Sequence, residues 1–243
     1  GAYSDMACRA VYPSKETLPC PGFEDMFQAV HAGAAELAMV PVENTVAGRV
    51  ADIHHLLPNS NLHIIGEHYE RVNHRLLVPK GATLETLETV HSHVHALSQC
   101  RKIFRELGLK PVVHADTAGS AKEVAELNDR TRGAIASELA AKIYGLEELR
   151  KDVEDDDHNT TRFLIMAKEP IDFEIEAGPA VTTFIFRVRN VSAALYKALG
   201  GFATNGVNMT KLESYMVGGA FSATMFYADI DGHPDYTPVR LAM

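Results

Sequence analysis

The chain has 243 residues, of which 46% are hydrophobic and 23% charged, a composition typical of soluble globular proteins with one or two domains. The net charge of −9, without any Lys/Arg run, argues against a nucleic-acid surface, and no stretch approaches the roughly 18 apolar residues of a membrane span. The opening residues lack the basic and apolar regions of a secretory signal, and three widely spaced cysteines cannot form a disulfide framework, so we expect a reducing, cytoplasmic compartment.

The first 168 residues alternate helix-like and strand-like segments. Amphipathic stretches predict helices at 24–31, 49–57, 94–107, 120–127 and up to Tyr144. Short apolar runs predict strands at 37–40, 62–66, 75–78, 110–114, 134–136 and 163–166. This alternation is typical of an α/β domain with a mostly parallel sheet, in which ligands bind where the strands end.

The segment 169–179 contains two prolines and four acidic residues and predicts a linker. Beyond it we expect a strand, a helix and two further strands, with a hairpin turn at Gly218-Gly219; the ranges are 183–188, 193–202, 211–217 and 221–230. This βαββ order is most of a ferredoxin-like βαββαβ unit.

Two polar stretches follow predicted strands in the first half of the chain. Asn44 and Thr45 come directly after the strand at 37–40 and could bind a ligand or simply cap the next helix. Three histidines in the run 91–95, ahead of Gln99, suggest a metal site, but no HExxH motif or cysteine partner supports one. We therefore interpret this run as polar groups at a helix entry and predict no metal.

Two more polar stretches could bind a small anion. Residues 116–120 form a Thr/Gly/Ser turn at a helix start, with Ser120 and Glu123 spaced as a capping box, so this turn is either a carboxylate site or a plain cap. Arg162 stands beside two threonine hydroxyls at a strand entry, where it could clamp a carboxylate or lie on an exposed strand edge. The residues alone indicate an α/β crevice for a small anion.

Six stretches in order resemble the prephenate dehydratase family. They are GAYS at 1–4, PVENT at 41–45, HSHVHALSQC at 91–100, DTAGSA at 116–121, ASELAAKIYGL at 136–146 and TTRF at 160–163. The resemblance implies a two-lobed catalytic domain over residues 1–168, like a periplasmic binding protein. Lobe one would hold about 1–72 plus 159–168 and lobe two about 73–158. It also implies a ferredoxin-like ACT domain at 180–243 that senses L-phenylalanine and pairs in a homodimer or a dimer of dimers.

The activity implied by the resemblance is the conversion of prephenate to phenylpyruvate, water and carbon dioxide in L-phenylalanine biosynthesis, without a cofactor. Thr161 would donate a hydrogen bond to the departing hydroxyl, and Arg162 would hold a carboxylate, for which we favour the pyruvyl one. Phe163 would line the site beside the ring of the substrate. The remaining substrate-binding residues would be Asn44, Thr45, Ser92, Gln99, Thr117, Ala118 and Gly119.

The chain departs from the family pattern at its ends and in the ACT motifs. It begins at the Gly-rich turn and lacks the last ACT helix and strand, so we expect a version truncated at both ends. The family's N-x-P-G-A-L motif is represented by Asn190, Ala193, Ala194 and Leu195, and its E-S-R-P motif by Glu213 and Ser214. These six are the candidate phenylalanine-binding residues. Two alternatives stay open, an arogenate dehydratase and a non-catalytic amino-acid or keto-acid sensor.

Overall fold

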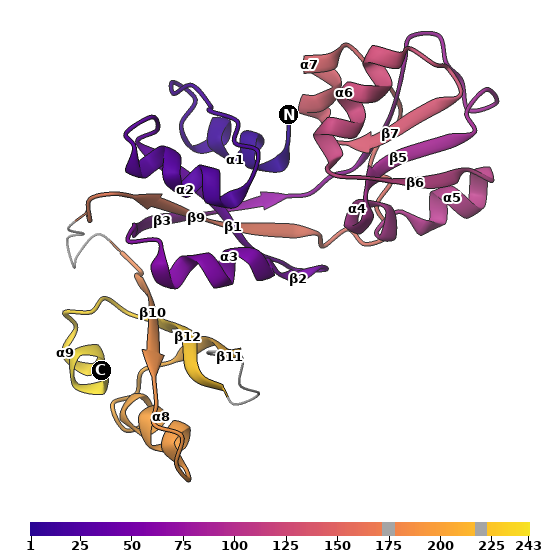
Figure 1. Ribbon diagram of the computed structural model, residues 1–243. Coiled ribbons are helices and arrows are strands. Elements are labelled where there is room, and N and C mark those ends of the chain that lie inside the picture. Colours follow the sequence, from indigo (N-terminus) through magenta and orange to yellow (C-terminus); the bar gives the residue numbers. More distant parts are fainter. Residues whose placement is uncertain (172–177, 217–222) are drawn as a thin grey trace. The chain divides into compact units, whose positions relative to one another are not determined.

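The computed structural model describes residues 1–171, 178–216 and 223–243, which form two compact units, Gly1–Pro170 and Ile171–Met243 (Figure 1). The boundary between the units falls within the predicted linker at 169–179. Part of that linker, and the predicted turn at Gly218-Gly219, lie outside the described residues. Within the described residues, no helix combines the length and the apolar character needed to cross a membrane.

Lobe one of the first unit is a four-stranded antiparallel sheet in the order β2-β1-β9-β3. Helices α1 and α2 lie on one face and α3 on the other (Figure 1). Ala7 of α1 packs on Met39, Phe163 and Ile165 of the sheet. The elements are α1 (Tyr3–Val11), α2 (Phe23–His31), β1 (Leu37–Asn44), β2 (Gly48–Arg49), α3 (Ala51–Leu56), a 3-10 turn (Leu57–Asn59), β3 (His63–Arg71) and β9 (Thr160–Ala167).

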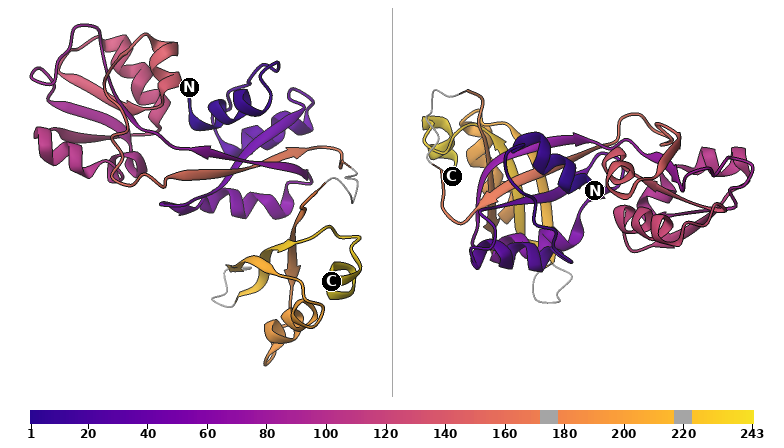
Figure 2. Two further views of the ribbon diagram at one scale, coloured as in Figure 1. Left: turned by 180° about the vertical axis from the view of Figure 1, so that it is seen from behind. Right: turned by 90° about the horizontal axis from the view of Figure 1, so that it is seen from above.

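Lobe two is a mixed five-stranded sheet in the order β6-β5-β7-β4-β8, with parallel pairs only at β5. Its alternating apolar residues face two helical layers: Leu76 and Ile135 pack with α4 and α5, whereas Leu77 and Ala134 pack with α6 and α7 (Figure 2). The elements are β4 (Arg75–Val78), β5 (Thr89–His93), α4 (Val94–Ser98), α5 (Arg101–Leu107), β6 (Lys110–His114), α6 (Thr117–Leu127), β7 (Arg132–Ala136), α7 (Glu138–Tyr144) and β8 (Glu147–Arg150).

The prediction of a mostly parallel sheet is wrong. Lobe one is antiparallel because its inner strand β9 arrives from the far side of lobe two and not through a βαβ crossover. The strand predicted at 37–40 also continues to Asn44, past Pro41, where a bulge relieves the pairing of a residue without an N–H. The PVENT stretch is therefore mostly strand and not a loop that follows one.

Two predicted helices have different limits. The stripe at 94–107 is broken at Gln99 and Cys100, because Cys100 leaves helical geometry and the Asp155 carboxylate accepts hydrogen bonds from the Arg101 and Lys102 N–H groups at 2.9 Å each. Helix α6 begins at Thr117 instead of Ser120, so Asp116 is its cap and the predicted capping box is absent.

The second unit is a three-stranded antiparallel sheet in the order β10-β12-β11, covered by two helices. Phe202, Ile230 and Val239 form its core. A short helix, α9, follows β12, so the expectation that the last helix is missing is wrong; Pro238 in its first turn suits a helix start. The elements are β10 (Val181–Arg187), α8 (Ala194–Thr204), β11 (Met209–Met216), β12 (Ala223–Asp231) and α9 (Thr237–Ala242).

Candidate active site

Asn44 is the last residue of strand β1, and both the oxygen and the nitrogen of its side-chain amide form hydrogen bonds. Its Oδ1 atom accepts hydrogen bonds from the backbone N–H groups of Val46 at 3.0 Å and Ala47 at 2.8 Å, which closes the turn after the strand. Its Nδ2 atom donates to Asn159 Oδ1 at 2.7 Å and to Thr161 Oγ1 at 3.0 Å. Asn44 therefore shapes a turn and orients a neighbour, and it does not cap α3, whose N-cap position is Val50.

Thr161 lies opposite Asn44 across the β1–β9 pair. Because its oxygen accepts a hydrogen bond from Asn44, its own proton stays available for another acceptor. Thr45 is engaged differently: its hydroxyl donates to the His158 carbonyl at 2.6 Å and accepts from the Thr160 N–H at 2.9 Å. Thr45 thus fastens the entry of β9 to β1.

Arg162 is buried, and the carboxylates around it belong to the protein. Its guanidinium binds Glu67 Oε2 at 2.7–2.8 Å and Glu43 Oε1 at 3.0 Å, one glutamate from each neighbouring strand. Through these contacts Arg162 joins β9 to both β1 and β3.

Phe163 points into lobe one. Its side chain is 1% exposed and packs with Ala7, Met39 and Ile165, so in this structure it forms core and not the wall of a cavity.

The predicted residues of lobe two are largely engaged with their own lobe. Ser92 is fully buried and donates to the Ile135 carbonyl at 2.6 Å. The Gly119 N–H donates to the Asp116 carboxylate at 2.6 Å, so this group is occupied by the helix cap. A Cβ on Gly119 would lie 2.4 Å from Asp116 Oδ2, which explains the need for glycine. Thr117 and Ala118 form the first turn of α6 beside it.

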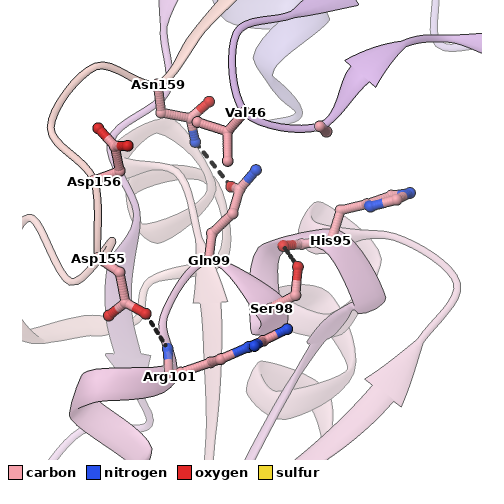
Figure 3. Close-up of a pocket in the computed structure, with 9 residues that line it drawn as sticks. Val46, His95, Ser98, Gln99, Arg101, Asp155, Asp156 and Asn159 are labelled. Atoms are coloured by element: carbon pink, nitrogen blue, oxygen red, sulfur yellow. Dashed lines mark hydrogen bonds between the residues drawn. The ribbon is translucent and has the colours of Figure 1, made fainter.

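A pocket of about 470 Å³ lies between the turn after β1 and helices α4 and α5 (Figure 3). Of the predicted site residues, Gln99 lines it. The Asp155 carboxylate on its rim is occupied by the α5 N-terminus. The lining residues are Val46, Ala47, His95, Ser98, Gln99, Arg101, Asp155, Asp156 and Asn159.

Sequence reasoning missed Asn159, His74 and Tyr3 as parts of the site. Gln99 Oε1 accepts from Asn159 Nδ2 at 2.8 Å and from His74 Nε2 at 3.0 Å, and the Tyr3 hydroxyl lies 3.0 Å from His74 Nδ1. Burial lowers the pKa of His74 and raises the pKa of Tyr3 well above its usual value, so both side chains are neutral near pH 7. Tyr3 lies in the GAYS stretch and Asn159 directly precedes TTRF, but a motif does not reveal which distant side chain its residues will contact.

The histidine run does not form a metal centre among the described residues, where no group of three or more His, Cys, Asp or Glu side chains is placed to hold an ion. His93 caps α4 by accepting a hydrogen bond from the His95 N–H, as expected for a helix entry.

The candidate phenylalanine-binding residues lie in two places in the second unit. Asn190 precedes α8, whose cap is Ala193 and whose first residues are Ala194 and Leu195. Glu213 and Ser214 lie on β11, a strand paired with β12. Ala193 has a φ of 59°, in the left-handed region that glycine adopts without strain.

Comparison with known proteins gives one consistent result. The family model described as "Prephenate dehydratase" matches residues 1–171. The chain is 53% identical over all 243 residues to the "Bifunctional N-acyl-homoserine lactone acylase/prephenate dehydratase" of Komagataeibacter europaeus and covers 86% of it. It is 42% identical to "Arogenate dehydratase/prephenate dehydratase 2, chloroplastic" of Arabidopsis thaliana, with 88% of this chain and 56% of that protein covered.

A solved structure shows the same fold over the whole chain. The prephenate dehydratase of Arthrobacter aurescens in complex with L-Phe superposes with a TM-score of 0.90 at 28% identity, covering 100% of this chain and 81% of that one.

Proposed function

The chain belongs to the prephenate dehydratase family, and from that premise we propose that it converts prephenate to phenylpyruvate, water and carbon dioxide. The observation that carries the proposal is the hydrogen bond from Asn44 to Thr161. It orients a hydroxyl whose own proton has no acceptor within the part of the chain that the structure describes. The reaction needs such a donor, since a hydroxyl must leave the ring.

The chemistry requires few groups. The bond between the ring and its carboxylate breaks, the electron pair moves through the ring, and the carbon–oxygen bond opposite breaks as the ring becomes aromatic. Thr161 donates a hydrogen bond to the departing oxygen, on which negative charge grows, and so stabilises the transition state more than the ground state. A threonine is too weak an acid to transfer its proton fully, so its role is hydrogen-bond donation within a fixed network, and solvent supplies the proton that converts the departing hydroxide to water.

The other predicted residues keep supporting roles in this proposal. Gln99 contacts substrate in the pocket, while Asn44 orients Thr161 and Thr45 fastens β9. Thr117 and Ala118 would direct the N-terminal end of α6 toward a substrate carboxylate, Gly119 leaves room for the Asp116 cap of that helix, and Ser92 is fixed on the neighbouring strand. For Arg162 we now propose that it holds β9 in register between Glu43 and Glu67.

The test is phenylpyruvate formation, followed by its ultraviolet absorbance in base, with prephenate and arogenate assayed side by side. Turnover of prephenate supports the proposal, and a clear preference for arogenate replaces the substrate while keeping the reaction. A folded chain that turns over neither substrate removes the proposal and favours the non-catalytic sensor.

We also propose that the second unit is an ACT domain that binds L-phenylalanine. Its βαββα order and its strand order β10-β12-β11 agree with the first five elements of a ferredoxin-like βαββαβ unit, and the Arthrobacter aurescens relative was solved with L-Phe. Calorimetry with millimolar phenylalanine tests this, and Ala193→Gly, which restores the family's residue, should tighten binding. No heat from either form would contradict the proposal. Light scattering tests the expected homodimer or dimer of dimers.

A second activity, hydrolysis of N-acyl-homoserine lactones, is favoured by the 53% identity to the Komagataeibacter europaeus protein over the full chain. Mass spectrometry of the fatty acid and homoserine lactone released from a C8 substrate tests it. Release that is first order in enzyme supports the activity; no release above the buffer blank contradicts it.

A further inference from the structure

Gln99 lines the pocket, and its amide is held from two directions. Its Oε1 atom accepts hydrogen bonds from Asn159 Nδ2 at 2.8 Å and from His74 Nε2 at 3.0 Å. Both donors are nearly inaccessible to solvent, Asn159 at 1% and His74 at 2% exposed. With its oxygen occupied in this way, the amide turns its nitrogen toward the space between Val46 and His95 (Figure 3).

The orientation of the Gln99 amide is set by Asn44 and Asn159, which belong to the same hydrogen-bond network. Because Asn44 Oδ1 accepts two backbone N–H groups, Asn44 Nδ2 must be the donor to Asn159 Oδ1. Asn159 therefore points its Nδ2 atom toward Gln99, and Gln99 must accept this hydrogen bond with its Oε1 atom. A flipped Gln99 would place two NH₂ groups against each other and leave buried donors unsatisfied.

His74 fixes the same amide from the other side. Its ring is buried and neutral, so it carries one proton, and Gln99 Oε1 requires that proton on Nε2. The Tyr3 hydroxyl donates to the Asn73 carbonyl at 2.8 Å, and His74 Nδ1 lies 3.0 Å from the same hydroxyl oxygen.

His74 and Asn159 lie in the two chain segments that connect the lobes. The Val72 N–H donates to the Asn159 carbonyl at 2.8 Å, and the Val153 N–H donates to the His74 carbonyl at 3.1 Å. The groups that orient Gln99 are therefore anchored in backbone shared by both lobes.

We propose that His74 and Asn159 are positioning residues that hold the Gln99 nitrogen toward the pocket, so that this position offers a donor and selects a ligand oxygen that accepts, from a ketone or a carboxylate. The proposal rests on the proposed function, because prephenate carries a pyruvyl ketone where arogenate carries an ammonium. An ammonium placed at this position would face another NH₂ group and gain no hydrogen bond.

A matched pair of variants tests the role of His74. His74→Gln can keep a donor at the position of Nε2, whereas His74→Asn keeps polarity near Nδ1 and loses that donor. For His74→Asn we expect the KM for prephenate to rise about tenfold with kcat nearly unchanged, and for His74→Gln a KM near that of the wild type. A structural role alone would lower the folded fraction of both variants and leave KM unchanged in each, which would overturn the proposal.

Binding of the α-keto acid phenylpyruvate, measured by calorimetry, separates this proposal from the proposed function. Wild type and His74→Gln should bind it alike, His74→Asn about tenfold more weakly, and Gln99→Glu, which lacks the donor, at least tenfold more weakly. This pattern without turnover of prephenate would sustain the positioning role while refuting the dehydratase activity. Equal affinity in all four proteins, or no binding to the wild type, would refute the positioning role.

Discussion

In lobe one Asn44 and Thr161 are hydrogen-bonded to each other across paired strands, whereas in lobe two the predicted site residues Ser92 and Gly119 are bonded within their own lobe. Asn44 and Thr161 meet because β1 and β9 are hydrogen-bonded neighbours in register. In lobe two, Ser92 is bound to the Ile135 carbonyl and the Gly119 N–H to the Asp116 cap. The Ser92 hydroxyl and the Gly119 N–H in lobe two are thus already used as donors, whereas the Thr161 hydroxyl in lobe one accepts a hydrogen bond and keeps its own proton.

The largest effect should come from removing that hydroxyl. Thr161→Ala should lower kcat by roughly two to four decades with little change in KM, because a donor that acts on the departing oxygen is lost. Steady-state assays with prephenate measure it. Thr160→Ala, at the neighbouring threonine, is the control and should keep a normal kcat. Near-normal turnover in Thr161→Ala would remove the hydroxyl from catalysis.

A second variant asks whether the strand register of lobe one depends on its buried ion cluster. Arg162→Met should lower the free energy of unfolding by about 3 kcal/mol, since it removes the buried guanidinium that the Glu43 and Glu67 carboxylates share. Urea unfolding followed by circular dichroism measures it, and adding Glu43→Gln and Glu67→Gln should restore most of the loss. Unchanged stability with a raised KM would instead return Arg162 to the substrate.

In lobe two, Ser92→Ala should cost about 1–3 kcal/mol of stability, because the buried Ile135 carbonyl loses its hydroxyl donor. The KM of the folded variant should stay close to that of the wild type. If KM rises while stability does not fall, Ser92 contacts substrate, and the contrast between the lobes is weaker than the structure indicates.

The smallest effect should come from the helix cap. Asp116→Ala should cost about 1 kcal/mol of stability. Ser137→Ala, at the cap of α7, is the matched comparison and should cost at least as much, since Ser137 also donates to the Gly1 carbonyl. Thermal unfolding of both variants ranks them; an unaffected Asp116→Ala would mean that water or a ligand satisfies the Gly119 N–H equally well.

Local patterns predicted the elements better than their pairing. The strands at β4 and β6 and the helix at α2 are confirmed within a residue, because short apolar runs and amphipathic stripes are local signals. The partnership of β1 with β9 joins segments more than a hundred residues apart, and a period of two says which face is buried but not which strand lies alongside.

The same limit applies to the site. The motif residues Asn44, Thr161 and Gln99 could be named from the sequence. The partners of Arg162 and the donors to Gln99 could not, because each comes from another segment of the chain, and even a residue inside a motif, such as Glu43, does not reveal its distant partner. Side-chain hydrogen bonds between distant segments leave no pattern in the chain that makes them.

The place of β9 between β1 and β3 has a consequence for the order in which the protein forms. Ribosomes deliver β1 and β3 first, then the whole of lobe two, and β9 last. Until β9 arrives, the edges of β1 and β3 that will face it stay open, and the contact between Asn44 and Thr161 cannot form. Lobe two is continuous in sequence, so its strands can pair without any later segment of the chain. In pulsed hydrogen exchange during refolding, amides of β5 and β7 should therefore become protected before those of β1; simultaneous protection would contradict this order.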